Sequence, residues 1–330
     1  MRHLLRSVLT GSIVAGAILV STSLGVEGQS APAPSTRPAK TWTQTKTPWG
    51  DPDLQGIWSY ATITPLERPT GEVGKEFLSD EEVAALNDAE ITRADKRNAN
   101  AAADVEQAYN AFWWDRGKST GRTSLIVDPP DGRLPPLTPE GELRRAAAAA
   151  RRATAYDSYE NRPLQERCII YHGVPPLPTG YNNHYQIYQT PGFVTILDEN
   201  IHDARVIPVN GRPHLPPNVR LWNGDSRGRW EGSTLVVETT NYSQKTTFRF
   251  PVVPESLKAV ERFTRVAADK IDYRYTITDP ATYTRPWTVS LPMTAIEGPI
   301  YEYACHEGNY GLAHVLEGAR AQEKRGETPR

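Results

Sequence analysis

Short runs of alternating apolar and polar residues follow one another through the second half of the chain, with turn residues between them. A period of two is typical of strands that bury one face, so each run predicts a strand. About eight to ten such strands in sequence order form an antiparallel meander, which removes its exposed edges by closing into a barrel or, alternatively, by forming a sandwich. The predicted fold class is therefore mainly β. The runs are Gly56–Trp58, Gln186–Gln189, Phe193–Asp198, Ile201–Val209, Arg229–Glu231, Thr234–Tyr242, Glu261–Val266, Ile271–Thr278, Thr284–Pro292 and Ile300–Cys305.

Three connections between these runs are short enough to predict hairpins, because adjacent antiparallel strands need only a few turn residues between them. The first is Thr190-Pro-Gly192 and the second is Gly232-Ser233. The third is Ala267–Lys270, which joins the runs Glu261–Val266 and Ile271–Thr278.

A region of different character, about residues 78–160, precedes most of these runs and predicts an insertion of helices and loops. The motif Ser79–Glu82 has the spacing of a capping box, which predicts a helix start. A second helix is expected over Thr138–Tyr159, with Pro in its first turn. Between them, the Pro-rich stretch Gly121–Pro136 predicts an irregular loop. We expect the insertion to lie over one opening or one side of the barrel, because its apolar stripes need a surface.

The amino terminus has the layout of a signal peptide, with Arg2 and Arg6 before an apolar run and small residues after it. The run is too short to cross a bilayer comfortably, which favours cleavage over an uncleaved membrane anchor. We expect residues 1–30 to be the signal peptide, residues 31–46 a Pro-rich tether, and residues 47–330 one barrel-like domain. The predicted location is periplasmic or secreted, with no membrane insertion after cleavage.

The net charge of the chain bears on its binding partners, and its cysteine content bears on disulfide formation. A net charge of -2 and a pI near 6.4 give no electrostatic footprint for nucleic acid. The chain has only two cysteines, Cys168 and Cys305. In an exported chain these predict one disulfide, the alternative being two separate buried thiols.

Several motifs resemble known families. Leu54-Gln-Gly-Ile-Trp58 resembles the Gly-x-Trp signature near the first strand of lipocalin-type (calycin) barrels, which implies a lipocalin-like barrel. The stretches 47–58, 224–232 and 301–310 resemble a family of exported bacterial proteins. The second resemblance implies export and kinship but carries no chemistry.

Strand alternation also predicts which side chains face the barrel interior. The rule groups Tyr273 with Tyr275, Arg285 with Trp287, Asp203 with Arg205, and Tyr303 with Cys305 and Glu307. An aromatic lumen with a few embedded charges is typical of a small-molecule pocket. Alternatively, the charges form ion pairs that hold a barrel mouth together. The expected ligand-contacting residues are Arg205, Arg285, Tyr273, Tyr275, Trp287 and Tyr303.

The expected catalytic groups are Glu307, His306, His202 and Asp203. In this hypothesis Glu307 or Asp203 acts as a base and a histidine as the second proton-transfer group, while Arg205 holds an anionic oxygen. A bulge near Gly308 would exchange Glu307 for His306 at the same place. The histidines lack a compact metal-binding spacing, so neither a metal nor another cofactor is predicted.

These observations lead to an exported enzyme that acts on a small organic molecule by acid/base chemistry, of the hydrolase, lyase or isomerase type. The alternative is a lipocalin-like protein that binds a small ligand without catalysis, and a third possibility is a structural envelope protein without a pocket. Charged groups that converge on an open cavity would favour the enzyme. A closed aromatic lumen with every charge paired would favour the binding protein.

Overall fold

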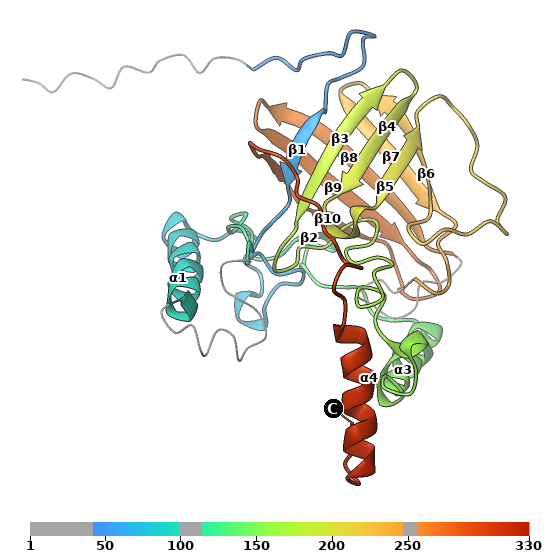
Figure 1. Cartoon of the computed structure of the whole chain (residues 1–330). Helices are drawn as coiled ribbons and strands as arrows, with labels where there is room; N and C mark the ends of the chain where they lie inside the picture. Colours follow the sequence, from blue (N-terminus) through green and yellow to red (C-terminus); the bar gives the residue numbers. More distant parts are fainter. Residues whose placement is uncertain (1–41, 99–113, 247–255, 330) are drawn as a thin grey trace, which may run out of the picture. The chain divides into compact units, whose positions relative to one another are not determined.

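The computed structural model describes residues 42–98, 114–246 and 256–329. The expected signal peptide and most of the expected tether lie outside these residues. The described part is mainly antiparallel β, with eleven strands in one sheet and three α-helices (Figure 1). The strands are β1 (Gly56–Ser59), β2 (Ile126–Asp128), β3 (His184–Thr190), β4 (Phe193–Asp198), β5 (Ala204–Pro208), β6 (Asp225–Glu231), β7 (Thr234–Thr240), β8 (Lys258–Ala267), β9 (Lys270–Thr278), β10 (Trp287–Ser290) and β11 (Met293–Ala295). The helices are α1 (Asp80–Asn98), α3 (Pro139–Ala153) and α4 (Gly311–Lys324).

The sheet curls into a nearly closed barrel, which confirms the predicted fold class. Its strand order is β5-β4-β3-β1-β11-β9-β8-β7-β6, and β10 pairs with β9 and β2. The end strands β5 and β6 lie beside each other. A side chain at Gly228 of β6 would come 2.7 Å from Val209 and 3.1 Å from Ile207, so glycine permits this close approach.

The three expected hairpins are present. In the β3–β4 hairpin Thr190 lies opposite Phe193, and Tyr185 lies opposite Asp198. The β6–β7 hairpin turns at Gly232, which has a positive φ of 60° that glycine adopts without strain. The β8–β9 pairing places Phe263 opposite Tyr273. Figure 1 shows β3, β4 and β5 in front of β8 and β9, as expected when a meander curls back on itself.

Four expectations about local structure are wrong. The predicted strand Ile201–Val209 begins only at Ala204, as β5, because Asn200–His202 forms a short 3-10 helix. The stretch Gly121–Pro136 is not wholly irregular, because Ile126–Asp128 pairs with β10 as strand β2 before the prolines begin. No strand forms over Ile300–Cys305, which is irregular. The predicted strand Thr284–Pro292 is shorter, since β10 begins only at Trp287.

The two predicted helices, α1 and α3, begin where the sequence predicts. The Ser79 N–H donates to the Glu82 carboxylate at 2.8 Å, and the Glu82 N–H donates to the Ser79 hydroxyl at 3.3 Å, which is a complete capping box. Thr138 caps α3 by accepting from the Gly141 N–H at 3.0 Å. This helix ends at Ala153, short of the predicted Tyr159.

The insertion is attached to the barrel through the segment between its helices. Leu125 and Ile126 belong to the hydrophobic core, and the Thr138 N–H donates to the Thr282 carbonyl at 2.9 Å. By contrast, no residue from 80 to 93 of α1 is buried, and α3 buries only Gly141. The described residues of the two helices therefore bury no hydrophobic core of their own.

An ion pair lies in the aromatic interior of the barrel. Arg205 of β5 and Glu261 of β8 form a two-pronged contact, with Nη2 to Oε1 at 3.0 Å and a second, shorter bond from Nη1 to Oε2. Their side chains are 9% and 0% exposed. The Tyr273 hydroxyl donates to the Glu261 carboxylate at 2.8 Å. Burial lowers the pKa of Arg205, but the adjacent Glu261 carboxylate raises it by more, so the guanidinium stays charged.

Breaking this ion pair from one side should destabilise the fold. Arg205→Met leaves a buried, uncompensated carboxylate, so we expect a loss of about 3–5 kcal/mol in the free energy of unfolding. Arg205→Met combined with Glu261→Gln removes that lone charge and should recover much of the loss. The measurement is urea unfolding of the two variants and the wild type.

The matched control is Arg229→Met, because Arg229 pairs with Glu231 at the surface, where both side chains are well exposed. This change should cost less than about 1 kcal/mol. Equal losses for Arg205→Met and Arg229→Met would contradict a stabilising role for the buried pair.

Because of the buried tyrosines in the barrel interior, we expect the free energy of unfolding to fall steeply at alkaline pH. Burial raises the pKa of four of them, and the negative charge of Glu261 adds to the effect. Their ordinary pKa of about 10 applies in the unfolded chain, so stability is intact below that pH and falls above it. The loss should approach about 5 kcal/mol per pH unit if all four stay protonated in the fold. The residues are Tyr185, Tyr242, Tyr273 and Tyr275.

The measurement is the free energy of unfolding as a function of pH, together with phenolate absorbance. Four tyrosines that ionise near their ordinary pKa without any loss of stability would contradict this prediction.

Candidate functional site

The structure divides the predicted site residues into two groups. Tyr273, Tyr275 and Trp287 are almost completely buried in the hydrophobic core, as strand alternation predicted. Arg205 also faces inward, but its partner is Glu261, which the sequence interpretation did not include. These residues pack the barrel interior.

The remaining predicted charges lie elsewhere. Arg285 is wrongly placed by alternation, since it precedes β10; its side chain is 49% exposed and lies 3.7 Å from Asp128. Glu307 and His306 are exposed rather than inward, because the expected strand is absent. Asp203 accepts a hydrogen bond from the Asn223 amide. His202 ends a short 3-10 helix at Asn200–His202, and its side chain is not among those described.

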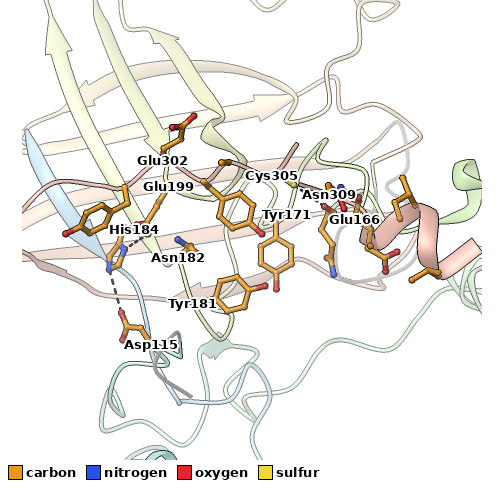
Figure 2. A pocket seen from close by; sticks show the side chains of 17 residues that line it. Asp115, Glu166, Tyr171, Tyr181, Asn182, His184, Glu199, Glu302, Cys305 and Asn309 are labelled. Atoms are coloured by element: carbon orange, nitrogen blue, oxygen red, sulfur yellow. Dashed lines mark hydrogen bonds and ion pairs between the residues drawn. The ribbon is translucent and has the colours of Figure 1, made fainter. Parts of the chain in front are cut away.

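A pocket of about 820 Å³ opens outside the barrel, where four parts of the chain meet (Figure 2). Asp115, from the segment after α1, is one of them, and the other three form walls. One wall comes from the ends of β3 and β4, and a second from the loop that precedes β3. The third comes from the segment after β11 and the first turns of α4. Of the predicted site residues, only Tyr303 and Cys305 line this pocket. Its lining residues are Asp115, Gln165, Glu166, Tyr171, Tyr181, Asn182, His184, Glu199, Tyr301, Glu302, Tyr303, Ala304, Cys305, Asn309, Gly311, Leu312 and Val315.

A histidine between two carboxylates lies at one side of this pocket. His184 Nδ1 forms a short hydrogen bond with the Glu199 carboxylate, and His184 Nε2 lies 3.7 Å from Asp115 Oδ2 (Figure 2). Glu199 is buried, with 7% of its side chain exposed, whereas His184 is 17% exposed. A carboxylate can only accept, so Nδ1 carries the hydrogen of this bond. In the neutral imidazole, Nε2 is then the nitrogen that can take up a proton.

The β3–β4 hairpin positions this histidine and its buried partner. Thr190 pairs with Phe193, so counting outward places His184 opposite Glu199. The backbone confirms this, because the Glu199 N–H donates to the His184 carbonyl at 3.1 Å. Directly opposed residues of an antiparallel pair project to the same face. The register of the hairpin therefore brings together His184 and Glu199, which we call the dyad.

Aromatic side chains form the middle of the pocket. Tyr171 and Tyr181 stack with ring centroids 6.2 Å apart and planes 22° apart. Behind them, the Trp114 ring meets Tyr181 edge-on, and the Arg116 guanidinium lies 4.2 Å from the centre of Trp114. The stacked tyrosines thus form an aromatic wall of the pocket, packed against Trp114.

A disulfide between Cys168 and Cys305 joins two walls of the pocket, as the cysteine count predicted. Two further contacts attach the carboxyl-terminal segment to the same loop region. Asn309 donates to the Glu166 carbonyl at 3.1 Å, and Arg320 of α4 donates to the Tyr156 carbonyl at 2.8 Å. The segment that carries Tyr301 and Glu302 is therefore held across the pocket by a covalent bond.

Strained backbone is concentrated around the pocket. Four non-glycine residues of the described chain have a positive φ, and three are associated with the pocket. Asn182 lines it, Cys168 is bonded to a lining residue, and Ile201 follows Glu199 by two positions. A β-branched residue such as Ile201 at φ 58° is costly, on the order of 1–3 kcal/mol. Such conformations cluster at functional sites, where geometry takes precedence over local stability.

The described histidines do not form a metal centre. No group of three or more His, Cys, Asp or Glu side chains in the described ranges could hold a metal ion. His214 instead pairs with Asp225 at 2.8 Å, and His184 pairs with Glu199. The described helices also include none with the length and apolar character needed to cross a membrane.

Fold and site together define a barrel-like protein with an aromatic, carboxylate-rich pocket outside the barrel. Comparisons with protein-family models, with curated proteins and with solved structures find no match to the chain. The resemblances to lipocalins and to a family of exported bacterial proteins therefore stay predictions.

Loss of the disulfide should loosen the pocket and spare the barrel. The bridge closes a loop across 137 positions, for which chain entropy gives about 5 kcal/mol of stabilisation, but neither cysteine belongs to the barrel core. In Cys168→Ser/Cys305→Ser we expect faster proteolytic cleavage within residues 296–310, while the barrel stays folded. Mass spectrometry of the fragments measures this change.

Thiol labelling under denaturing, non-reducing conditions gives an independent check on the wild type. We expect no reactive thiol before reduction and two after it, from the two cysteines of the chain. Two labelled thiols before reduction would contradict the bridge.

Proposed function

We propose that the protein is an enzyme that binds a small organic molecule in the pocket outside the barrel and transfers a proton through His184. The observation that carries this proposal is the hydrogen bond between His184 and the buried Glu199 at the edge of an open pocket. A buried carboxylate that orients an imidazole is the arrangement used in general acid/base catalysis.

The proposed chemistry follows from the proton positions. Glu199 holds the Nδ1–H, so Nε2 accepts a proton from the substrate or from a water molecule that attacks it. Glu199 and Asp115 then stabilise the imidazolium, with Asp115 Oδ2 3.7 Å from Nε2. The described residues that line the pocket include no serine, threonine or lysine, and the lining cysteine is in the disulfide. This composition favours direct proton transfer over a covalent intermediate at those residue types.

Two costly features beside the dyad support a functional role. Ile201 has a positive φ, as described above. Asn200 is buried, and neither polar atom of its side chain has a hydrogen-bond partner among the described residues. A buried unsatisfied amide costs about 1–3 kcal/mol. Strain and an unsatisfied group next to Glu199 are expected where the position of a catalytic partner matters more than stability.

We also propose that the protein acts outside the cytosol, in the periplasm or after secretion. The disulfide supports this location, because such bonds persist in oxidising compartments. The signal-peptide layout of residues 1–30 supports it independently.

The second candidate function is ligand binding without catalysis, as in lipocalin-like proteins. One observation favours it: the barrel interior is aromatic and its Arg205 charge is paired with Glu261. Because Arg205 is fully paired, no free charged group of this ion pair is left in the interior to take part in chemistry. The choice between the two functions therefore depends on His184.

Substitution of the dyad should separate turnover from binding. The purified protein is incubated with a mixture of small metabolites, and substrate loss and product gain are followed by mass spectrometry. We expect His184→Gln to lower the rate by at least about 100-fold, which is within the range of a lost acid/base group. Glu199→Gln should lower it less, because the imidazole remains.

Ultrafiltration of the same mixtures measures retention of bound metabolites. The His184→Gln variant should still retain the substrate, and His214→Gln, which changes a histidine outside the pocket, should keep full activity. Retention of a ligand by the wild type without any conversion would instead establish the binding protein.

A further inference from the structure

Among the described residues, the charged side chains that line the pocket are carboxylates, apart from His184. They belong to Asp115, Glu166, Glu199 and Glu302, and the described lining contains no lysine or arginine. Arg162, outside the lining, compensates Glu166 through a two-pronged contact at 2.8 and 2.9 Å. His184 is the partner of Glu199. The pocket therefore keeps a net negative charge that is not balanced within its walls.

Glu302 contributes the most available of these charges. It is exposed, and among the described residues it makes no ion pair. It belongs to the segment that the Cys168–Cys305 disulfide holds across the pocket. The bridge thus keeps an exposed carboxylate at the pocket.

The aromatic wall of the pocket favours a positively charged ligand, as the carboxylates do. Tyr171, Tyr181, Tyr301 and Tyr303 all line the pocket. Figure 2 shows Tyr171 and Tyr181 between the His184 side and the Glu166 side of the pocket. The face of an aromatic ring is electronegative, so several tyrosines beside carboxylates attract an organic cation and disfavour an anion. A bare metal ion is a poorer match, because the described chain holds no cluster of metal ligands.

We infer that the pocket takes a small organic cation, a molecule with an ammonium group, held between the tyrosine faces and the carboxylates. This inference rests on the proposed function and names its substrate class. The ammonium group lies against the aromatic wall, and the rest of the molecule reaches His184, where a proton is transferred. The pocket volume of about 820 Å³ accommodates a molecule of that size.

Titration calorimetry with three probes of similar size tests the inference on the full mature chain. The probes are choline, its neutral isostere in which carbon replaces the quaternary nitrogen, and trimethylacetate as the anion. We expect choline to bind at least about tenfold more tightly than the isostere, and trimethylacetate not to bind. Added salt should weaken choline binding and leave the isostere unaffected.

Variants locate the binding in this pocket. Glu302→Gln and Tyr181→Leu should each lower choline affinity by at least about threefold. Glu307→Gln is the matched control, an exposed glutamate of the same segment that does not line the pocket. If Tyr181→Leu fails to fold, Tyr301→Leu replaces it, because the Tyr301 side chain is exposed.

The outcomes separate this inference from the proposed function. Equal or tighter binding of the isostere or of trimethylacetate, or unchanged affinity in Glu302→Gln, overturns the cation site. Turnover of neutral molecules that depends on His184 would still stand in that case. Choline binding by a protein without His184-dependent turnover would support the cation site and overturn the acid/base function.

Discussion

The ion pair between Arg205 and Glu261 is the contact on which the arrangement of the barrel depends. It joins β5, at one end of the strand order, to β8, which lies near the other end. The end strands β5 and β6 contact each other beside Gly228, and the ion pair crosses the interior behind them. A buried pair contributes little net stability compared with packed apolar residues, but a misplaced strand would leave two charges unpaired. Closure in any other register is therefore strongly disfavoured.

The pocket inherits its geometry from this closure. Backbone pairing connects β5 to β4 and β4 to β3, so the hairpin that carries His184 is positioned by the strand that carries Arg205. Outside the barrel, the other walls have little regular structure of their own. The disulfide and the Asn309 contact hold them together instead. The paired hairpin thus positions His184 and Glu199, while loops tethered by the disulfide form the rest of the pocket wall.

Local patterns in the sequence predicted the strands and hairpins well, and predicted the site poorly. Alternation placed Tyr273 and Tyr275 inward correctly because β9 is a long regular strand. The same rule failed for Arg285 and Glu307, since neither residue lies in a strand. Glu261 shares a strand face with Phe263, a signal that was present and was missed. The predicted turn at Thr190-Pro-Gly192 would place His184 opposite Asp198; the observed turn is one residue shorter, because Thr190 pairs with Phe193, and this places His184 opposite Glu199. The helix α4 was missed as well. The meeting of loops at the pocket, by contrast, has no local signal, because it depends on contacts between distant segments.

The position of the site follows from what fills the barrel. Large aromatic side chains occupy the interior together with one ion pair, so positive and negative charge are balanced there. Electroneutrality and close packing suit the interior to stability, since a buried unpaired charge costs several kcal/mol. Chemistry that needs an uncompensated charge must then occur where water can reach it. At the pocket, the carboxylates of Asp115 and Glu302 are exposed, so solvent lowers their energy. The division between a charge-balanced core and a charged pocket therefore allows the barrel to remain stable while exposed carboxylates are kept outside it.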